Sequence, residues 1–501
     1  MDTQTLPTAY TALYDRFRRI ALVGEALGHL DWDLNTMMPP GGAETRAEQL
    51  STLAALRHGM ITDPALADLL NAAEAAGGLD PWHAANLREM RRNWRHANAL
   101  ETDLVEAMTR AGATCERVWR EARPEADFAK VLPNLREVLR LSQEAAAAKA
   151  EALGCAPYDA LLDQYEPDGR SADIDVLFAD LEAFLPDFLG QALDHQKAMP
   201  APVLPAGPFP VDIQKSLGEQ LMGAIGFDFN HGRLDESLHP FSGGTPDDLR
   251  ITTRYDEADF TTALMGVLHE TGHALYEHQL PKPWRWQPVG DARGMSIHES
   301  QSLLLEMQVC RSRAFLDFAA PLMRAAFNGT GAAWSVENLT RIYTQVKPDF
   351  IRVDADEVTY PAHVILRYRL ERKLIDGAMD LADLPSAWNE GMEQLLGIRP
   401  PDDRLGCLQD IHWYDGAWGY FPTYTLGAMA AAQLYQAALR DVPGIPGAVA
   451  AGDFKPLMGW LRDHVHGQGS KLSTTGLMAA ATGAPLGTEA LKAHLTRRYL
   501  A

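Results

Sequence analysis

Apolar residues three and four positions apart recur along most of the chain, and this periodicity limits the fold more than any other feature. Only residues 250–255, Arg-Ile-Thr-Thr-Arg-Tyr, have the β-branched character of a strand, and they follow the turn-like stretch 242–247. The sequence therefore predicts a mainly α fold with one short strand in a small sheet. The predicted helices span residues 8–30, 43–76, 82–121, 134–152, 174–198, 257–279, 297–326, 335–346, 355–377, 385–395, 422–440 and 453–464.

A proline-rich stretch interrupts the helical pattern once. Five prolines lie between residues 200 and 210, and so many prolines close together cannot fit in a helix interior. We predict a loop over 200–212. A length of 501 residues would allow about three domains of average size, but helical enzymes often form one larger body. We therefore expect a single domain over 1–501, with an N-terminal helical part (1–199), the loop, and a second part (213–501).

Charge and composition exclude several classes of partner. The net charge is −22, and such an acidic surface repels phosphate backbones and anionic lipid, so we expect neither nucleic acid nor membrane as a partner. No stretch reaches the roughly 18 apolar residues of a membrane span, and the N-terminus lacks the pattern of a secretory signal. The four cysteines are far apart, which is typical of structural thiols in a reducing cytoplasm.

The most informative segment is His269-Glu270-Thr271-Gly272-His273, inside a predicted helix. Residues four apart on a helix differ by about 40° in direction and about 6 Å in height, so both imidazoles can face one point. This spacing suits two of the three protein ligands of a catalytic zinc ion, whose remaining position is left for water. Glu270 projects near the same face and is the candidate general base.

A third ligand must come from another segment. Glu299, at the start of the next predicted helix, is the leading candidate, and Glu306 and Asp291 are alternative carboxylates. A different role is also open to Glu299, because Ser296 and Glu299 have the spacing of a capping box. In that role its carboxylate would fold back onto its own helix start. Spacing alone leaves these alternatives open.

Together, His269–His273 and His298-Glu299-Ser300 resemble the M32 family of metallocarboxypeptidases, the carboxypeptidase Taq group. The likeness extends from about residue 30 to 430. Further matching stretches are Asp31-Trp32-Asp33 with Thr36 and Met38-Pro39, His239-Pro240-Phe241, Asp248-Leu249-Arg250-Ile251-Thr252, Ile351-Arg352-Val353-Asp354-Ala355-Asp356 and Gly406-Cys407-Leu408-Gln409-Asp410-Ile411-His412-Trp413.

The resemblance implies a saddle-like helical subunit with a deep groove, similar in shape to angiotensin-converting enzyme and neurolysin. It also implies a homodimer, Zn²⁺ or Co²⁺ as the metal, and Glu299 as the third ligand. The implied activity is hydrolysis of the C-terminal peptide bond of peptides, with broad specificity. An oligopeptidase that cuts within short peptides is the alternative. A catalytically silent peptide-binding module is disfavoured by Glu270, because a structural zinc needs no base.

Peptide hydrolysis also needs hydrogen-bond donors for the oxyanion. Tyr420, Tyr424 and His412 are the candidates, because relatives of this shape use a tyrosine or histidine in this region. The competing interpretation is that the two phenol rings only pack in the core and form local hydrogen bonds.

A carboxypeptidase must also bind a free α-carboxylate, for which arginine is well suited. Arg352 is the first candidate and Arg250 the second, although Arg352 can instead pair with Asp354 or Asp356. A peptide that adds as a strand along 250–255 would be held through its backbone. The other predicted substrate contacts are His239, Asp248 and His298, and the predicted carboxylate partners of the zinc histidines are Glu277 and Asp356.

Overall fold

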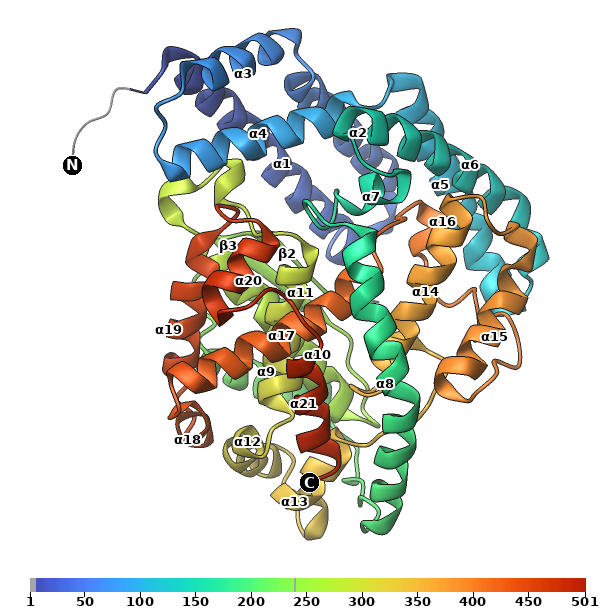
Figure 1. Cartoon of the computed structure of the whole chain (residues 1–501). Helices are drawn as coiled ribbons and strands as arrows, with labels where there is room; N and C mark the ends of the chain where they lie inside the picture. The colour runs from blue at the N-terminus through green and yellow to red at the C-terminus, as the bar shows by residue number, and fades with distance from the viewer. Residues whose placement is uncertain (1–5, 238–239) are drawn as a thin grey trace.

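The computed structural model describes residues 6–237 and 240–501, and helices dominate it, as the periodicity predicts (Figure 1). The helices of the N-terminal part are α1 (Thr8–Thr36), α2 (Ala43–Ile61), α3 (Pro64–Ala76), α4 (Pro81–Asn98), α5 (Thr102–Glu125), α6 (Phe128–Leu153), α7 (Pro157–Leu162) and α8 (Ser171–Ala198). Within the described residues, no helix is both long and apolar enough for a bilayer span.

The second part begins after the proline-rich segment with α9 (Val211–Ile225). It continues with α10 (Phe260–His278), α11 (Met295–Leu303), the π-helix η4 (Leu304–Cys310), α12 (Arg313–Ala326), α13 (Val336–Tyr343), α14 (Tyr360–Ile375), α15 (Leu384–Leu396), α16 (His412–Asp415), α17 (Pro422–Asp441), α18 (Ile445–Ala450), α19 (Lys455–His464), α20 (Thr474–Thr482) and α21 (Glu489–Tyr499). Short 3₁₀ turns lie between several of these helices.

Three long helices of the prediction are divided in the structure. The predicted helix 43–76 breaks before Pro64, where the Asp63 side chain accepts a hydrogen bond from the Ala65 amide and caps α3. The predicted helix 82–121 is likewise two helices, α4 and α5, and 297–326 is α11, the π-helix and α12. Periodicity misses these breaks because the hydrophobic pattern continues across each of them.

The small sheet has three strands, β1 (Gly232–Glu236), β2 (Phe241–Thr245) and β3 (Asp248–Thr253), in the order β1-β3-β2. β3 pairs parallel with β1 and antiparallel with β2. The stretch 242–247 was therefore wrongly predicted as a turn, because most of it is strand β2. Since β3 is central, a peptide cannot pair along 250–253, and the prediction of an added strand there is also wrong.

A continuous buried core joins residues from Cys115 to Tyr499, whereas α1, α3 and α4 enclose a smaller core of their own. α10, α11 and α17 lie together in the centre of the molecule, and α1–α4 cover one end of it (Figure 1). A cavity of about 600 Å³ lies between α1, α2 and α4 on one side and the C-terminal end of α10 on the other. Glu277, Met295 and His298 are among its lining residues.

Candidate metal centre

Helix α10 carries the two histidines, and its sequence explains both its start and its buried face. The Asp259 side chain accepts a hydrogen bond from the Thr261 amide and caps the helix. Phe260, Leu264 and Leu268 are buried along one face. The rings of His269 and His273, one turn apart, have centroids separated by 5.1 Å.

Helix α11 crosses α10 at Gly272, between the two histidines. A Cβ atom at this position would come within 2.6 Å of the Ser302 Cα atom, a backbone atom that cannot give way. Glycine therefore permits the close approach of the two helices. This approach brings Glu299 to the histidine pair.

Glu299 does not cap its own helix. The amide of Ser296 donates instead to the Glu166 carboxylate, over 3.1 Å, and the amide of Met295 donates to the carbonyl of Tyr165. The Glu299 carboxylate is thereby free to face α10.

The side chains of His269, His273 and Glu299 converge on one point. Glu299 Oε2 lies 3.4 Å from His273 Nε2 and 4.0 Å from His269 Nε2, and one ligand atom from each residue falls within 4.8 Å of the others. Burial would raise the pKa of Glu299, but the two histidines lower it to about 2, so the carboxylate is ionised. Two imidazole nitrogens and one carboxylate oxygen match the ligand chemistry of a divalent transition metal with an open position.

The second nitrogen of each imidazole is also held. His269 Nδ1 lies 2.9 Å from Glu306 Oε2, and Glu306 is also paired with Arg311. Such contacts orient a ligating histidine and set its tautomer. Glu306, an alternative ligand in the sequence prediction, therefore lies on the far side of the His269 ring from Glu299.

The partner of His273 is another histidine. The Nδ1 atoms of His273 and His298 are 2.7 Å apart, and His298 Nε2 lies 2.8 Å from Glu277 Oε1. Glu277 thus reaches His273 only through His298. Asp356 was predicted as a further partner, but its carboxylate accepts backbone amides of Lys347, Val358 and Thr359.

Glu270 is 8% exposed and lies on α10 between the two histidines in sequence. Its carboxylate is close enough to act electrostatically on both imidazoles. Asp291, the remaining alternative ligand, lines the cavity and is not part of the cluster of ligand atoms.

The candidate oxyanion donors come from α16, α17 and the loop between them. His412 Nε2 lies 3.2 Å from the Tyr424 hydroxyl, and the rings of Tyr420 and Tyr424 meet edge to face at 5.1 Å. Both tyrosines are close enough to Glu299 to interact with it electrostatically. Burial raises the pKa of Tyr424 to about 12, so its phenol keeps its proton and can donate it in a hydrogen bond.

Arg352 is buried and lies next to this segment. It pairs with Asp410 at 2.9 Å, and its guanidinium stacks over the Tyr424 ring at 4.6 Å. Arg367 binds the other oxygen of the same carboxylate at 2.6 Å. Two arginines share one aspartate, so the cluster keeps one positive charge. Neither Asp354 nor Asp356, the partners considered from sequence, forms this ion pair.

Arg250 belongs to a different surface. It pairs with Asp248 at 2.7 Å and stacks on the Trp32 ring at 4.5 Å. This contact joins two of the stretches that the sequence analysis singled out, Asp31–Asp33 and Asp248–Thr252. His239 lies outside the described residues.

Sequence reasoning missed two residues at this centre and the role of a third, Glu306, which it named only as an alternative ligand. Asp410 was noted only as part of a matching stretch, yet its carboxylate accepts hydrogen bonds from both Arg352 and Arg367. Gly427 touches Glu299, and Glu306 orients His269. No spacing rule connects these residues, because each contact joins segments that are distant along the chain.

A helical fold that holds two histidines, a carboxylate from the following helix and an adjacent glutamate is that of a metal-dependent peptidase. Comparison with known proteins gives the family. A sequence model described as "Carboxypeptidase Taq (M32) metallopeptidase" matches residues 12–499. This chain belongs to the M32 family and is a metallocarboxypeptidase, a peptide hydrolase.

Individual relatives are similar to this chain over nearly its full length. Thermostable carboxypeptidase 1 of Thermus thermophilus is 38% identical, over 99% of each chain. The structure of Trypanosoma cruzi metallocarboxypeptidase 1 is 41% identical with a TM-score of 0.96, covering 98% of this chain and 99% of the other. The M32 carboxypeptidase from Deinococcus radiodurans R1 is 34% identical with a TM-score of 0.92, covering 99% and 100%.

Proposed function

We propose that this metallocarboxypeptidase uses Zn²⁺ held by His269, His273 and Glu299 and releases single residues from the C-termini of peptides with broad specificity. The observation that carries the proposal is the convergence of three ligand atoms on one point. The two contacts behind the imidazoles support it further, because ligating histidines usually make such contacts. Co²⁺ suits the same ligands.

A divalent cation at this point would polarise the scissile carbonyl and lower the pKa of water to roughly 7. Glu270 then acts as the general base: it accepts a proton from the attacking water and returns that proton to the departing nitrogen. Its position on α10, electrostatically coupled to both histidines, supports this role.

Tyr420, Tyr424 and His412 hold the developing oxyanion or the peptide beside it. Tyr424 has the strongest support, because its neutral phenol lies at the junction of Glu299, His412 and Arg352. A preorganised donor in a site closed to water stabilises charge more than a donor in bulk water does.

The substrate α-carboxylate binds on the side of Arg352. The excess positive charge of Arg352 and Arg367 over Asp410 supports this assignment, since it leaves one charge for an anionic ligand. Arg250 is less suited, because Asp248 already neutralises it. His298, which lines the cavity, contacts the remainder of the peptide.

We propose three further properties, each with its own support. The chain is one peptidase domain, supported by a core that continues from Cys115 to Tyr499. It forms a homodimer, as the family resemblance implies. It acts in the cytoplasm, supported by four free cysteines.

The test is mass spectrometry of the products from matched peptides with free and amidated C-termini. We expect one residue released per cut, no cleavage of the amidated peptide, loss of activity with a chelator and recovery with Zn²⁺ or Co²⁺. Internal cleavage that ignores amidation would show the oligopeptidase instead. Activity that survives full metal removal would contradict the proposed centre.

A further inference from the structure

The segment that carries Glu306 is a π-helix, Leu304–Cys310, inserted between α11 and α12. In a π-helix, hydrogen bonds run from residue i to i+5, so the register slips relative to the flanking α-helix and carbonyls near the slip need other donors. Such insertions cost free energy and are frequent at functional sites. Here the π-helix places Glu306 against His269.

A side chain from the far end of the sequence supplies the missing donors. Arg498, in the C-terminal helix α21, donates to the carbonyl of Met307 and, over 3.1 Å, to that of Gln308. These two residues directly follow Glu306. The Arg498 guanidinium therefore fixes the backbone of the two residues that follow Glu306.

Arg498 is itself fixed by a buried carboxylate. It pairs with Glu357 Oε1 at 2.6 Å, and His494, one turn earlier on α21, lies 2.8 Å from Glu357 Oε2. Glu357 has only 2% of its side chain exposed, and Arg498 has 12%. A carboxylate is buried this deeply only where partners compensate its charge. The ion pair with Glu357 therefore fixes the position of the Arg498 guanidinium.

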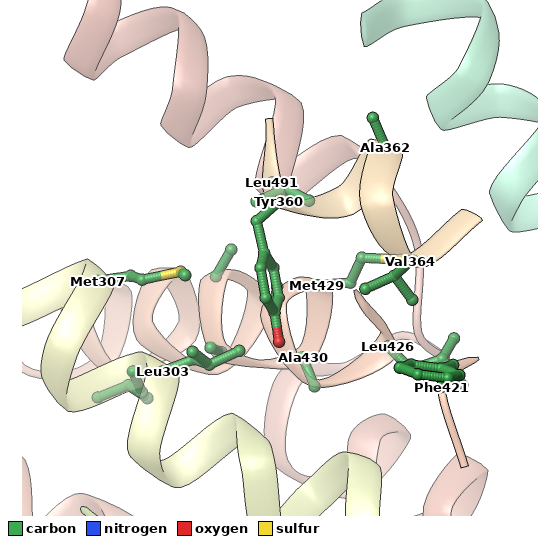
Figure 2. Close-up of a cluster of buried hydrophobic side chains, with 14 of the residues drawn as sticks. Leu303, Met307, Tyr360, Ala362, Val364, Phe421, Leu426, Met429, Ala430 and Leu491 are labelled. Atoms are coloured by element: carbon green, nitrogen blue, oxygen red, sulfur yellow. The ribbon is translucent and has the colours of Figure 1, made fainter. Parts of the chain in front are cut away.

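Apolar packing holds the same helix in place. Figure 2 shows Leu491 of α21 within the group of buried side chains that also contains Tyr360, Met307 and Leu303. α21 thus binds the π-helix through Arg498, while its apolar face packs into the buried core.

We propose that α21 is a clamp on the metal centre and that Arg498 is a positioning residue for the ligand His269, acting through the π-helix and Glu306. The inference rests on the proposed metal site. A weaker hold on the carbonyls of Met307 and Gln308 lets Glu306 move, and His269 then loses the partner that fixes its orientation.

The experiment compares full-length Arg498→Gln, Arg498→Lys and Arg497→Gln with the unaltered protein. Arg497 is the matched control, because it is exposed on the same helix. Zn²⁺ dissociation constants come from chelator competition, the visible spectrum of bound Co²⁺ reports ligand geometry, and thermal unfolding of the metal-free protein reports stability.

We expect Arg498→Gln to raise the Zn²⁺ dissociation constant by about 10-fold, the lower end of the range for lost outer-shell contacts, and to alter the Co²⁺ spectrum. Arg498→Lys keeps a cation that reaches one carbonyl, so its Zn²⁺ dissociation constant should lie between those of Arg498→Gln and the unaltered protein. Arg497→Gln should match the unaltered protein. A folded Arg498→Gln protein with unchanged affinity and spectrum would overturn the clamp, whatever its melting temperature.

Two further variants keep the outcome decisive. If Arg498→Gln does not fold, Glu357→Gln releases Arg498 without changing the shape of the buried site, and its metal affinity answers the same question. His273→Ala separates the two proposals. If it binds Zn²⁺ as tightly as the unaltered protein, the proposed metal site is wrong, whereas loss of binding there with normal binding in Arg498→Gln rejects only the clamp.

Discussion

Gly427 of α17 lies directly against the side chain of Glu299. A Cβ atom at position 427 would come within 2.8 Å of both Cβ and Cγ of the glutamate. Tyr424 lies three positions earlier on the same helix, so the contact also sets its distance from the ligand cluster. Gly427 therefore lets α17, which carries the candidate oxyanion donor Tyr424, approach the candidate ligand Glu299 of α11 closely.

The first prediction concerns this contact. Gly427→Ala should displace Glu299, since a methyl group at 2.8 Å cannot be accommodated without movement. Overpacking of this kind typically costs about 1–3 kcal/mol, and we expect about a tenfold weaker Zn²⁺ affinity by chelator competition. Gly190→Ala, in α8 where a Cβ meets no atom within 4 Å, is the control and should bind metal normally.

The second prediction concerns the base. Glu270→Gln preserves the size of the side chain but removes its ability to accept a proton. We expect peptide hydrolysis to fall by about 10²–10⁴-fold, while metal content, measured by elemental analysis, stays at the level of the unaltered protein. Activity within a few-fold of the unaltered enzyme would rule Glu270 out as the base.

The third prediction compares the two carboxylates behind the histidines. Glu306 has 12% of its side chain exposed and contacts His269 directly, whereas Glu277 is 32% exposed and acts through His298. Glu306→Gln should therefore weaken metal binding by about 10–100-fold, and Glu277→Gln by less. Equal dissociation constants for the two variants would show that burial and directness do not govern the effect.

The fourth prediction separates catalysis from packing for the tyrosines. Loss of an oxyanion donor typically lowers kcat by about 10²–10³-fold. We expect a fall of this size in Tyr424→Phe, with KM little changed, and a smaller one in Tyr420→Phe. Tyr435→Phe, further along α17, should keep its kcat and serves as the control. Normal kcat in both test variants would leave the rings with a packing role only.

The fifth prediction concerns the free C-terminus. Arg352→Gln leaves Asp410 paired with Arg367, so the aspartate keeps a partner. We expect KM for a peptide with a free C-terminus to rise at least tenfold, whereas inhibition by its amidated analogue stays the same. Because both ligands are measured on one variant, a general loss of stability affects them alike. Equal weakening of binding for the free and the amidated peptide would show that Arg352 does not bind the α-carboxylate.

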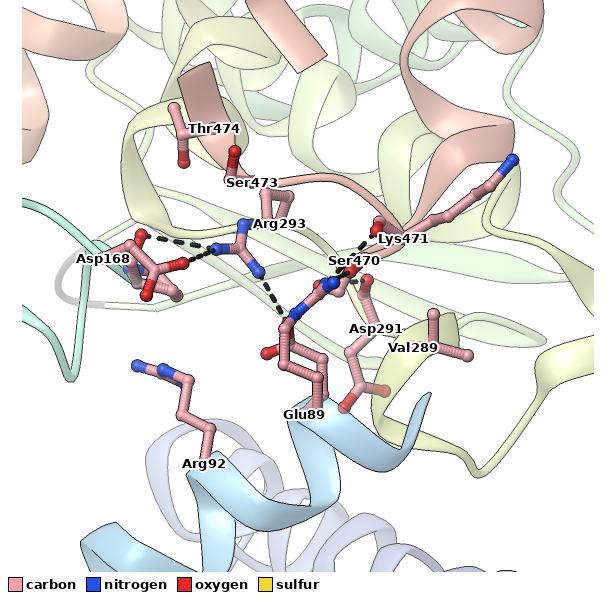
Figure 3. A network of polar contacts seen from close by, with 12 residues as sticks. Glu89, Arg92, Asp168, Val289, Asp291, Arg293, Ser470, Lys471, Ser473 and Thr474 are labelled. Carbon is pink, nitrogen blue, oxygen red and sulfur yellow. Dashed lines mark hydrogen bonds and ion pairs between the residues drawn. The ribbon is translucent and has the colours of Figure 1, made fainter. Parts of the chain in front are cut away.

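A network of ion pairs away from the metal centre joins the N-terminal helices to the loop between α10 and α11. Arg293, whose side chain has no exposed surface, pairs with Glu89 of α4 and with Asp168 before α8 (Figure 3). A buried guanidinium needs partners that compensate its charge, so these ion pairs tie the covering helices to the start of α11. Nothing in the local sequence around Arg293 indicates either partner.

Most helices were predictable because amphipathic periodicity is a local property. The breaks were not, since the cap at Asp63 and the π-helix after Leu303 interrupt a pattern that continues past them. α7, α9, α16, α18, α20 and α21 were missed, and α21 carries Arg498. The order of the small sheet was also beyond prediction, because strand pairing depends on contacts between separate segments.

By itself, the sequence determined that His269 and His273 share one helix face with Glu270 between them, because one helical turn sets that geometry without any other part of the chain. Only the tertiary structure decided which carboxylate meets them and which stands behind them. The spacing in sequence favoured Glu299 but left Glu306 open as an alternative, and the crossing of α10, α11 and α17 at Gly272 and Gly427 separates their places. Such crossings depend on how closely backbones can approach, a property that no single segment contains.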